Sequence, residues 1–98
     1  MPANISIDRQ QIADFCERHH IRKLWFFGSV LTNDFRPDSD VDALYEFEDG
    51  FAPGWDIDQI EEELSSLLGR KVDLVPAKYL SHWIRDRIMA GAEVQYVR

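Results

Sequence analysis

Cysteine and long hydrophobic runs are scarce in this chain of 98 residues. Cys16 is its only cysteine, which excludes an internal disulfide framework and indicates a reducing, cytoplasmic environment. No apolar run approaches the roughly 20 residues of a membrane-spanning helix. The N-terminus has neither the basic nor the apolar region of a secretory signal. We therefore expect no membrane association and a single domain, residues 1–98, with one modest core.

Basic residues are also few, at 11 against 18 acidic ones, and the net charge is −7. This balance argues against broad nucleic-acid binding, which depends on neutralising phosphates. Between Asp34 and Glu63 there are twelve acids and one base, Arg36. Such a run is either a solvated surface or a set of carboxylates that converge on a cation, and the spacing of the acids must decide.

The hydrophobic pattern predicts an α+β fold, one mixed β-sheet of about four strands with helices packed on it. Helices are expected from Ser6 or Asp8 to about His20, from a cap at Asp56 to a stop at Gly69, and over 78–90. Strands are expected at 23–27, 40–47, 72–75 and 93–97, with a short helical turn and a loop over 30–39. On the last helix the expected buried face holds Leu80, Ile84, Ile88 and the nearby Trp83.

Two acids stand two positions apart at the start of the second strand. Side chains at this spacing leave the same face of a strand, so Asp40 and Asp42 lie together. Two such carboxylates repel each other unless a cation or protons neutralise them. Mg²⁺ prefers oxygen ligands and keeps substrate phosphates in its shell, so the pair suits Mg²⁺ carrying a nucleotide. Taken alone, the pair also fits a polar strand face.

Two further features support the interpretation that this part of the chain binds Mg²⁺ and a nucleotide. Gly28 and Ser29 close the first strand, where a glycine lets backbone N–H groups approach a phosphate and a serine adds a donor. Asp73 lies in an otherwise apolar strand, and a buried strand rarely tolerates an unpaired carboxylate. The alternatives are a plain turn at Gly28–Ser29 and an ion pair of Asp73 with Arg70 or Lys71.

Gly28-Ser29, ten residues and then Asp40-Val41-Asp42 resemble the GS-x10-DxD signature of the DNA polymerase β-like nucleotidyltransferases. Asp73 stands in the place of their third carboxylate, and the chain is similar over essentially its whole length to the minimal nucleotidyltransferases. The resemblance implies the polymerase β-like fold and an antitoxin partnered with a HEPN-domain toxin ribonuclease. It further implies transfer of AMP from ATP to a tyrosine of that toxin, which silences it.

The resemblance also implies roles for individual residues. Asp40, Asp42 and Asp73 would be the catalytic carboxylates that hold Mg²⁺, with two ions expected. The nucleotide-binding residues would be Gly28, Ser29, Arg36 and Ser39. Arg36 could equally form a salt bridge with Asp34 or Asp38, and Ser39 could equally be a turn residue.

Two other functions remain open at this point. One is the catalytic subunit of an aminoglycoside-type nucleotidyltransferase, which acts on a small molecule. The other is a non-catalytic antitoxin that masks the toxin by binding, although such a binder has no need of three carboxylates. Among the remaining candidates, His19, His20, His82 and Cys16 lack the spacing of a zinc site, and Cys16 is expected in the core. Trp55 and Trp83 fit either an interface or half-buried structure.

Overall fold

The computed structural model describes residues 8–32, 36, 39–51 and 57–98. Its helices are α1 (Arg9–Arg18), α2 (Ile57–Leu68) and α3 (His82–Gly91), with short 3₁₀ helices η1 (Gly28–Leu31) and η3 (Ala77–Tyr79). Its strands are β1 (Ile21–Phe27), β2 (Val41–Phe47), β3 (Val72–Pro76) and β4 (Glu93–Val97). Among these residues no helix is both long and apolar enough to cross a bilayer.

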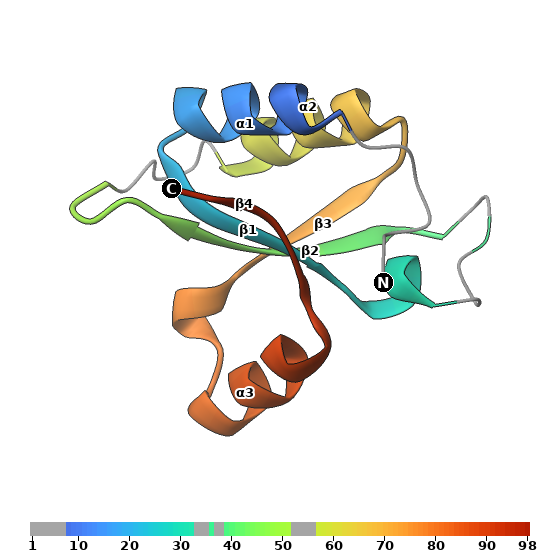
Figure 1. Ribbon diagram of the computed structural model, residues 1–98, viewed down its shortest axis with the longest axis vertical. Coiled ribbons are helices and arrows are strands. Elements are labelled where there is room, and N and C mark those ends of the chain that lie inside the picture. The colour runs from blue at the N-terminus through green and yellow to red at the C-terminus, as the bar shows by residue number, and fades with distance from the viewer. Residues whose placement is uncertain (1–7, 33–35, 37–38, 52–56) are drawn as a thin grey trace.

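The four strands form one mixed sheet in the order β3-β2-β1-β4. β1 pairs antiparallel with β2 and β4, whereas β2 and β3 are parallel and are connected through α2. Helices α1 and α2 cover one face of the sheet and α3 lies on the other (Figure 1). The predicted α+β architecture is therefore confirmed.

The larger core lies between the sheet and the pair α1 and α2. The alternation in β2 sends Val41, Ala43 and Tyr45 into this core, as the sequence predicts. Leu44 points to the opposite face, where it packs with Trp25 in a smaller cluster. The two faces of β2 are therefore both partly apolar, and the smaller cluster is the one that α3 covers.

The ends of the helices follow the expected capping chemistry. Asp8 caps α1, because its Oδ1 accepts hydrogen bonds from the backbone N–H groups of Gln10 (3.0 Å) and Gln11 (3.2 Å). Gly69 follows α2 with a φ of +69°, the left-handed conformation that favours glycine after a helix. The predicted caps Ser6 and Asp56 lie outside the described residues.

The prediction for the last helix was wrong in its start and in two residues of its buried face, Trp83 and Ile84, whereas Leu80 and Ile88 pack against the smaller cluster as expected. Residues 77–79 form η3, and Leu80 is extended (φ −76°, ψ 143°), so α3 begins only at His82. Because Leu80 lies before the helix in extended conformation, Leu80 and Ile84 are not one helical turn apart and do not share a helix face. As a result Trp83 is 62% exposed and Ile84 is 37% exposed, while Ile88 packs against the smaller cluster.

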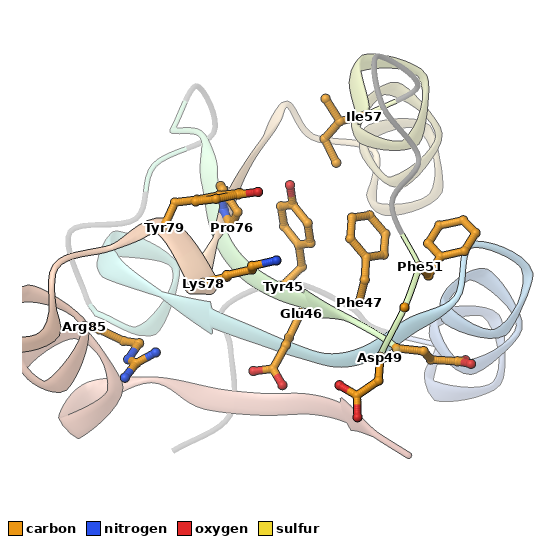
Figure 2. Close-up of a pocket in the computed structure, with 12 residues that line it drawn as sticks. Tyr45, Glu46, Phe47, Asp49, Phe51, Ile57, Pro76, Lys78, Tyr79 and Arg85 are labelled. Carbon is orange, nitrogen blue, oxygen red and sulfur yellow. The ribbon is translucent and has the colours of Figure 1, made fainter.

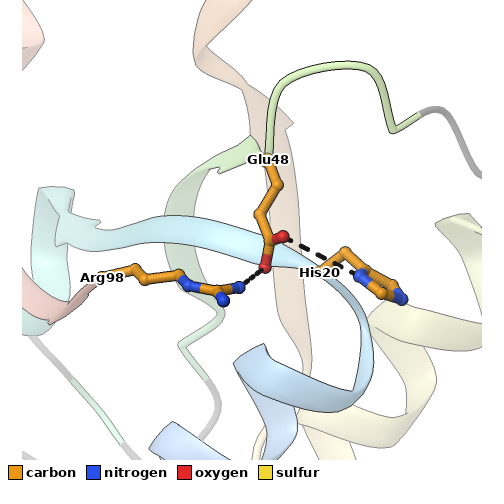
Figure 3. Close-up of polar contacts among 3 residues, drawn as sticks. All are labelled: His20, Glu48 and Arg98. Carbon is orange, nitrogen blue, oxygen red and sulfur yellow. Dashed lines mark hydrogen bonds and ion pairs between the residues drawn. The ribbon is translucent and has the colours of Figure 1, made fainter.

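A polar cluster joins the ends of three elements (Figure 3). Glu48, directly after β2, forms an ion pair with Arg98 and lies 4.0 Å from His20 Nδ1. The backbone N–H of Glu48 also donates to the carbonyl of His20 at 2.8 Å. His20 itself has a φ of +59° and stacks on Phe51. Because the Arg98 side chain is largely exposed, the ion pair mainly fixes how the ends meet and adds little stability.

Candidate active site

Strand pairing places two of the predicted carboxylates side by side. In the β2–β3 ladder Asp42 is the partner of Asp73, and in the β1–β2 ladder it is the partner of Phe27. Their chain neighbours Val41 and Val72 are buried in the larger core, so both carboxylates leave the opposite face of the sheet. This is the face on which α3 packs.

Gly28 brings the end of β1 against Asp42. Its φ is +79°, and a Cβ atom built on it would lie 2.6 Å from Asp42 Oδ2. Only a glycine therefore fits both the backbone conformation and the close approach of the carboxylate. The structure thus brings together the two halves of the predicted motif, Gly28-Ser29 and Asp40-x-Asp42.

Burial and the neighbouring carboxylates make it harder to ionise Asp42. Burial raises the pKa of the Asp42 carboxyl, and the negative charges of Asp73 and then Asp40 raise it further. The group is therefore harder to ionise than an ordinary aspartate, and a bound cation would relieve the repulsion.

Asp73 and Asp40 are both exposed. The expectation of an acid in a buried strand was wrong for Asp73, because its side chain leaves the sheet on the face opposite α1 and α2 and is exposed there. Arg70, one of the two bases considered as a partner of Asp73, instead donates to the backbone carbonyls of Arg36 and Ser39. The carboxylate of Asp73 is thus held beside Asp42 by the backbone ladder and faces solvent.

Two polar residues of α2 hold β3 in place, and the sequence pattern did not reveal them. Ser65 Oγ accepts a hydrogen bond from the backbone N–H of Val72 at 2.9 Å, and Glu61 Oε2 accepts one from Leu74 at 2.8 Å. Both donors flank Asp73 on the outer edge of the strand. Glu61 therefore has a structural role that its place in a run of acids does not indicate, since spacing alone cannot distinguish a solvated glutamate from one that caps a strand edge.

Arg36 and Ser39 form a turn before β2. Ser39 Oγ accepts from the backbone N–H of Arg36 at 2.9 Å, and Arg70 donates to the carbonyl of Arg36 at 2.8 Å. Arg70, which the sequence suggests only as a partner of Asp73, thus positions this turn. The other proposed partners of Arg36, Asp34 and Asp38, lie outside the described residues.

The donor set suits a hard divalent cation, although the side chains are not gathered into a finished site. In residues 8–32, 36, 39–51 and 57–98 no group of three or more His, Cys, Asp or Glu side chains is arranged to hold a metal ion. Asp40, Asp42 and Asp73 nevertheless supply oxygen ligands only, and the charges of Asp73 and Asp40 help to raise the pKa of Asp42. The chemistry of these residues thus fits Mg²⁺.

The remaining candidates have structural roles. His19 lies 3.1 Å from Glu63, which also pairs with Arg18 at 2.7 Å and so joins α1 to α2. Burial, together with the charge of Glu17, raises the pKa of the Cys16 thiol to about 12, so this buried cysteine is no nucleophile. Trp55 lies outside the described residues.

A separate cavity of about 600 Å³ lies at the other end of β2 (Figure 2). Its aromatic lining includes Tyr45, Phe47 and Phe51, and its rim includes Lys78 and Arg85. None of the predicted site residues lines it. The cavity is therefore distinct from the carboxylate site.

Comparison with known proteins agrees with this geometry. Residues 9–93 match the family described as nucleotidyltransferase domain, and the chain belongs to this family of enzymes. It is 37% identical over 81 residues to the protein adenylyltransferase MntA of Thermococcus cleftensis, covering 83% of this chain and 79% of that protein. The predicted class of enzyme is thereby confirmed.

Solved structures confirm the fold. One described as a minimal nucleotidyltransferase is 33% identical with a TM-score of 0.72, over 86% of this chain and 85% of that one. A toxin-antitoxin structure with AMP-PNP also has a TM-score of 0.72, at 18% identity, over 94% of this chain and 75% of that one. The structure of a tri-AMPylated Shewanella oneidensis HEPN toxin in complex with MNT antitoxin has a TM-score of 0.65 at 16% identity, over 92% of this chain and 70% of that one. The last two likenesses concern the fold alone.

Proposed function

We propose that this protein is an antitoxin that, with Mg²⁺, transfers AMP from ATP to a tyrosine hydroxyl of a cognate HEPN-domain toxin and thereby neutralises it. The observation that carries the proposal is the contact of Gly28 with Asp42, with Asp73 as the neighbour of Asp42 in the sheet. The protein adenylyltransferase MntA is a relative, and an MNT antitoxin of similar fold occurs in complex with an AMPylated HEPN toxin. Both support the choice of a protein as acceptor.

In the proposed reaction the tyrosine oxygen attacks the α-phosphorus of ATP. An oxygen–phosphorus bond forms to the tyrosine, the bond from the α-phosphorus to the bridging oxygen breaks, and pyrophosphate leaves. Asp73, which is exposed and neighbours Asp42 in the sheet, would accept the proton of the hydroxyl. The role of the chain is mainly to position groups and to balance charge, as is usual in phosphoryl transfer.

The nucleotide would lie across the end of β1. Gly28 has no side chain to block a phosphate, and Ser29 follows it in η1 with a hydroxyl that can donate. Arg36 is exposed on the turn before β2, where its guanidinium can reach a phosphate. Asp40, Asp42 and Asp73 would hold the Mg²⁺, which when bound neutralises the negative charge that develops on the phosphate oxygens.

The test is transfer of label from ATP labelled at the α-phosphate, with Mg²⁺ and the purified toxin. Asp42→Asn keeps the size of the side chain and removes its charge, so we expect the rate to fall about 100-fold or more, the scale for losing a group that acts on transition-state charge. The matched control is Asp58→Asn, an exposed acid of α2. It should transfer at the wild-type rate.

The position of the label separates the candidate functions. Label on the toxin supports the proposal, and label only on an added aminoglycoside would favour the small-molecule enzyme. A complex that forms and neutralises the toxin without labelling would point to masking by binding alone. Transfer by the Asp42→Asn protein at the wild-type rate would refute the site.

A further inference from the structure

The outer side of α3 exposes an apolar and basic surface that the fold does not use. We define the α3 patch as Trp83, Ile84 and Arg87, which line one surface hollow together with Ile88. Trp83 is 62% exposed and Ile84 37%, and none of the residues of α3 is buried. Among the described residues, six large hydrophobic side chains are exposed, of which two lie on α3 and none on α1 or α2. Large exposed apolar side chains grouped on one helix beside an arginine mark an interaction surface.

The α3 patch lies on the same face of the sheet as the carboxylates. Leu44 and Val75 pack in the cluster beneath α3, together with Ile88. Asp42 and Asp73 stand two residues earlier on the same two strands, which is about 7 Å along the strand direction. Helix α3 therefore lies on the same face of the sheet as the site, whereas α1 and α2 cover the opposite face (Figure 1).

The charges on the two faces favour different partners. The segment over η3 and α3 carries Lys78, Arg85 and Arg87 against one acid, Asp86, in a chain with a net charge of −7. Helix α2, by contrast, carries four acids and no base (Asp58, Glu61, Glu62 and Glu63). An acidic surface would be repelled by α2 and attracted to α3.

We propose that the α3 patch is the docking surface for the acceptor protein, which presents an apolar pocket for Trp83 and acidic groups for Arg87. The proposal rests on the proposed function, because it is the acceptor that must be seated beside Asp42. Docking on α3 brings a hydroxyl to the carboxylates, which docking on α1 or α2 would not.

The test measures the affinity of the toxin for the chain and the KM and kcat of AMP transfer. Trp83→Ala and Arg87→Glu should each weaken toxin binding at least about tenfold and raise the KM for the toxin, with ATP affinity within twofold of wild type. The matched controls are Val97→Ala, an exposed apolar residue of β4, and Arg9→Glu, an exposed arginine of α1. Both controls should bind the toxin as the wild type does.

The outcomes distinguish the two proposals. Wild-type transfer with unchanged binding by both α3 variants would overturn the docking surface and leave the function standing. Absence of transfer by the wild type would overturn the function, and the docking proposal with it. A Trp83-dependent dimer of the chain alone, seen by sedimentation, would overturn the docking proposal because a second copy would then cover the patch.

Discussion

At the residue scale, the site depends on a glycine and an aspartate that touch. The sequence motif predicted that Gly28 and Asp42 belong together, because their spacing is typical of a known family. It could not predict that a Cβ at position 28 would lie 2.6 Å from the carboxylate, since that distance depends on the β1–β2 register. Nor could it predict Arg70 as the residue that holds the turn at Arg36, because no local pattern joins them.

Gly28→Ala should therefore damage both stability and activity. The left-handed backbone at φ +79° costs an alanine about 1–2 kcal/mol, and the new methyl must also displace Asp42. Gly50→Ala is a matched control, since Gly50 has a φ of +80° with nothing within 4 Å of the added Cβ. We expect both variants to lose stability in urea unfolding, Gly28→Ala at least as much as Gly50→Ala, and only Gly28→Ala to lose AMP transfer. Equal transfer by the two variants would contradict the contact.

At the element scale, the strands were more predictable than the last helix. Alternation identifies β2 because its apolar residues also fill the larger core. The boundaries of α3 were not predictable, since the extended conformation of Leu80 is a tertiary choice that a helical spacing conceals. The hydrogen bonds from β3 to α2 were not predictable either, because Ser65 and Glu61 look in the sequence like ordinary polar residues of a helix.

Ser65→Ala tests this edge contact. It leaves the backbone N–H of Val72 without its acceptor in a partly buried position, which should cost about 1–3 kcal/mol. Ser66→Ala, at an exposed position on the same helix, is the control and should cost less than about 0.5 kcal/mol. Thermal unfolding measures both, and the Tm should fall by about 4–8 °C per kcal/mol for a domain of this size. An equal Tm for the two variants would show that the hydrogen bond contributes nothing.

At the scale of the whole molecule, negative charge gathers around one site. In a chain with a net charge of −7, three of the acids lie around a site whose oxygen ligands suit a cation. A metal ion held there would invert the local sign, which is how an acidic protein can bind a nucleotide. We therefore expect the stability of the fold to be coupled to whether this site is occupied.

The coupling predicts how stability depends on pH and on Mg²⁺. The pKa of Asp42 is raised in the folded protein, so the free energy of unfolding falls as the pH rises through that value. Asp42→Asn removes this fall, and at pH 7 the variant should melt at a higher temperature than the wild type. Below the ordinary carboxyl pKa of about 3.9 the difference should close, because the wild-type side chain is then neutral too.

Mg²⁺ provides the complementary measurement. Added to the wild type at pH 7 it should raise the Tm, because it binds the folded carboxylates, and added to Asp42→Asn it should raise the Tm much less. Asp58→Asn again serves as the control and should respond as the wild type does. If Mg²⁺ raised the Tm of Asp42→Asn as far as that of the wild type, the carboxylates would not be its binding site.

The pairing of β4 with β1 has a consequence for how the molecule assembles. Phe26 of β1 pairs with Glu93 of β4, a residue far away in the sequence, whereas the connection between β1 and β2 is much shorter. Closing a long loop costs more entropy than closing a short one, so the β1–β4 ladder is expected to form late in folding and to open early. Helix α3 connects η3 to β4, so we expect the proposed docking surface to become ordered late in folding, together with β4. A partner bound to α3 would then stabilise the pairing of β4 with β1.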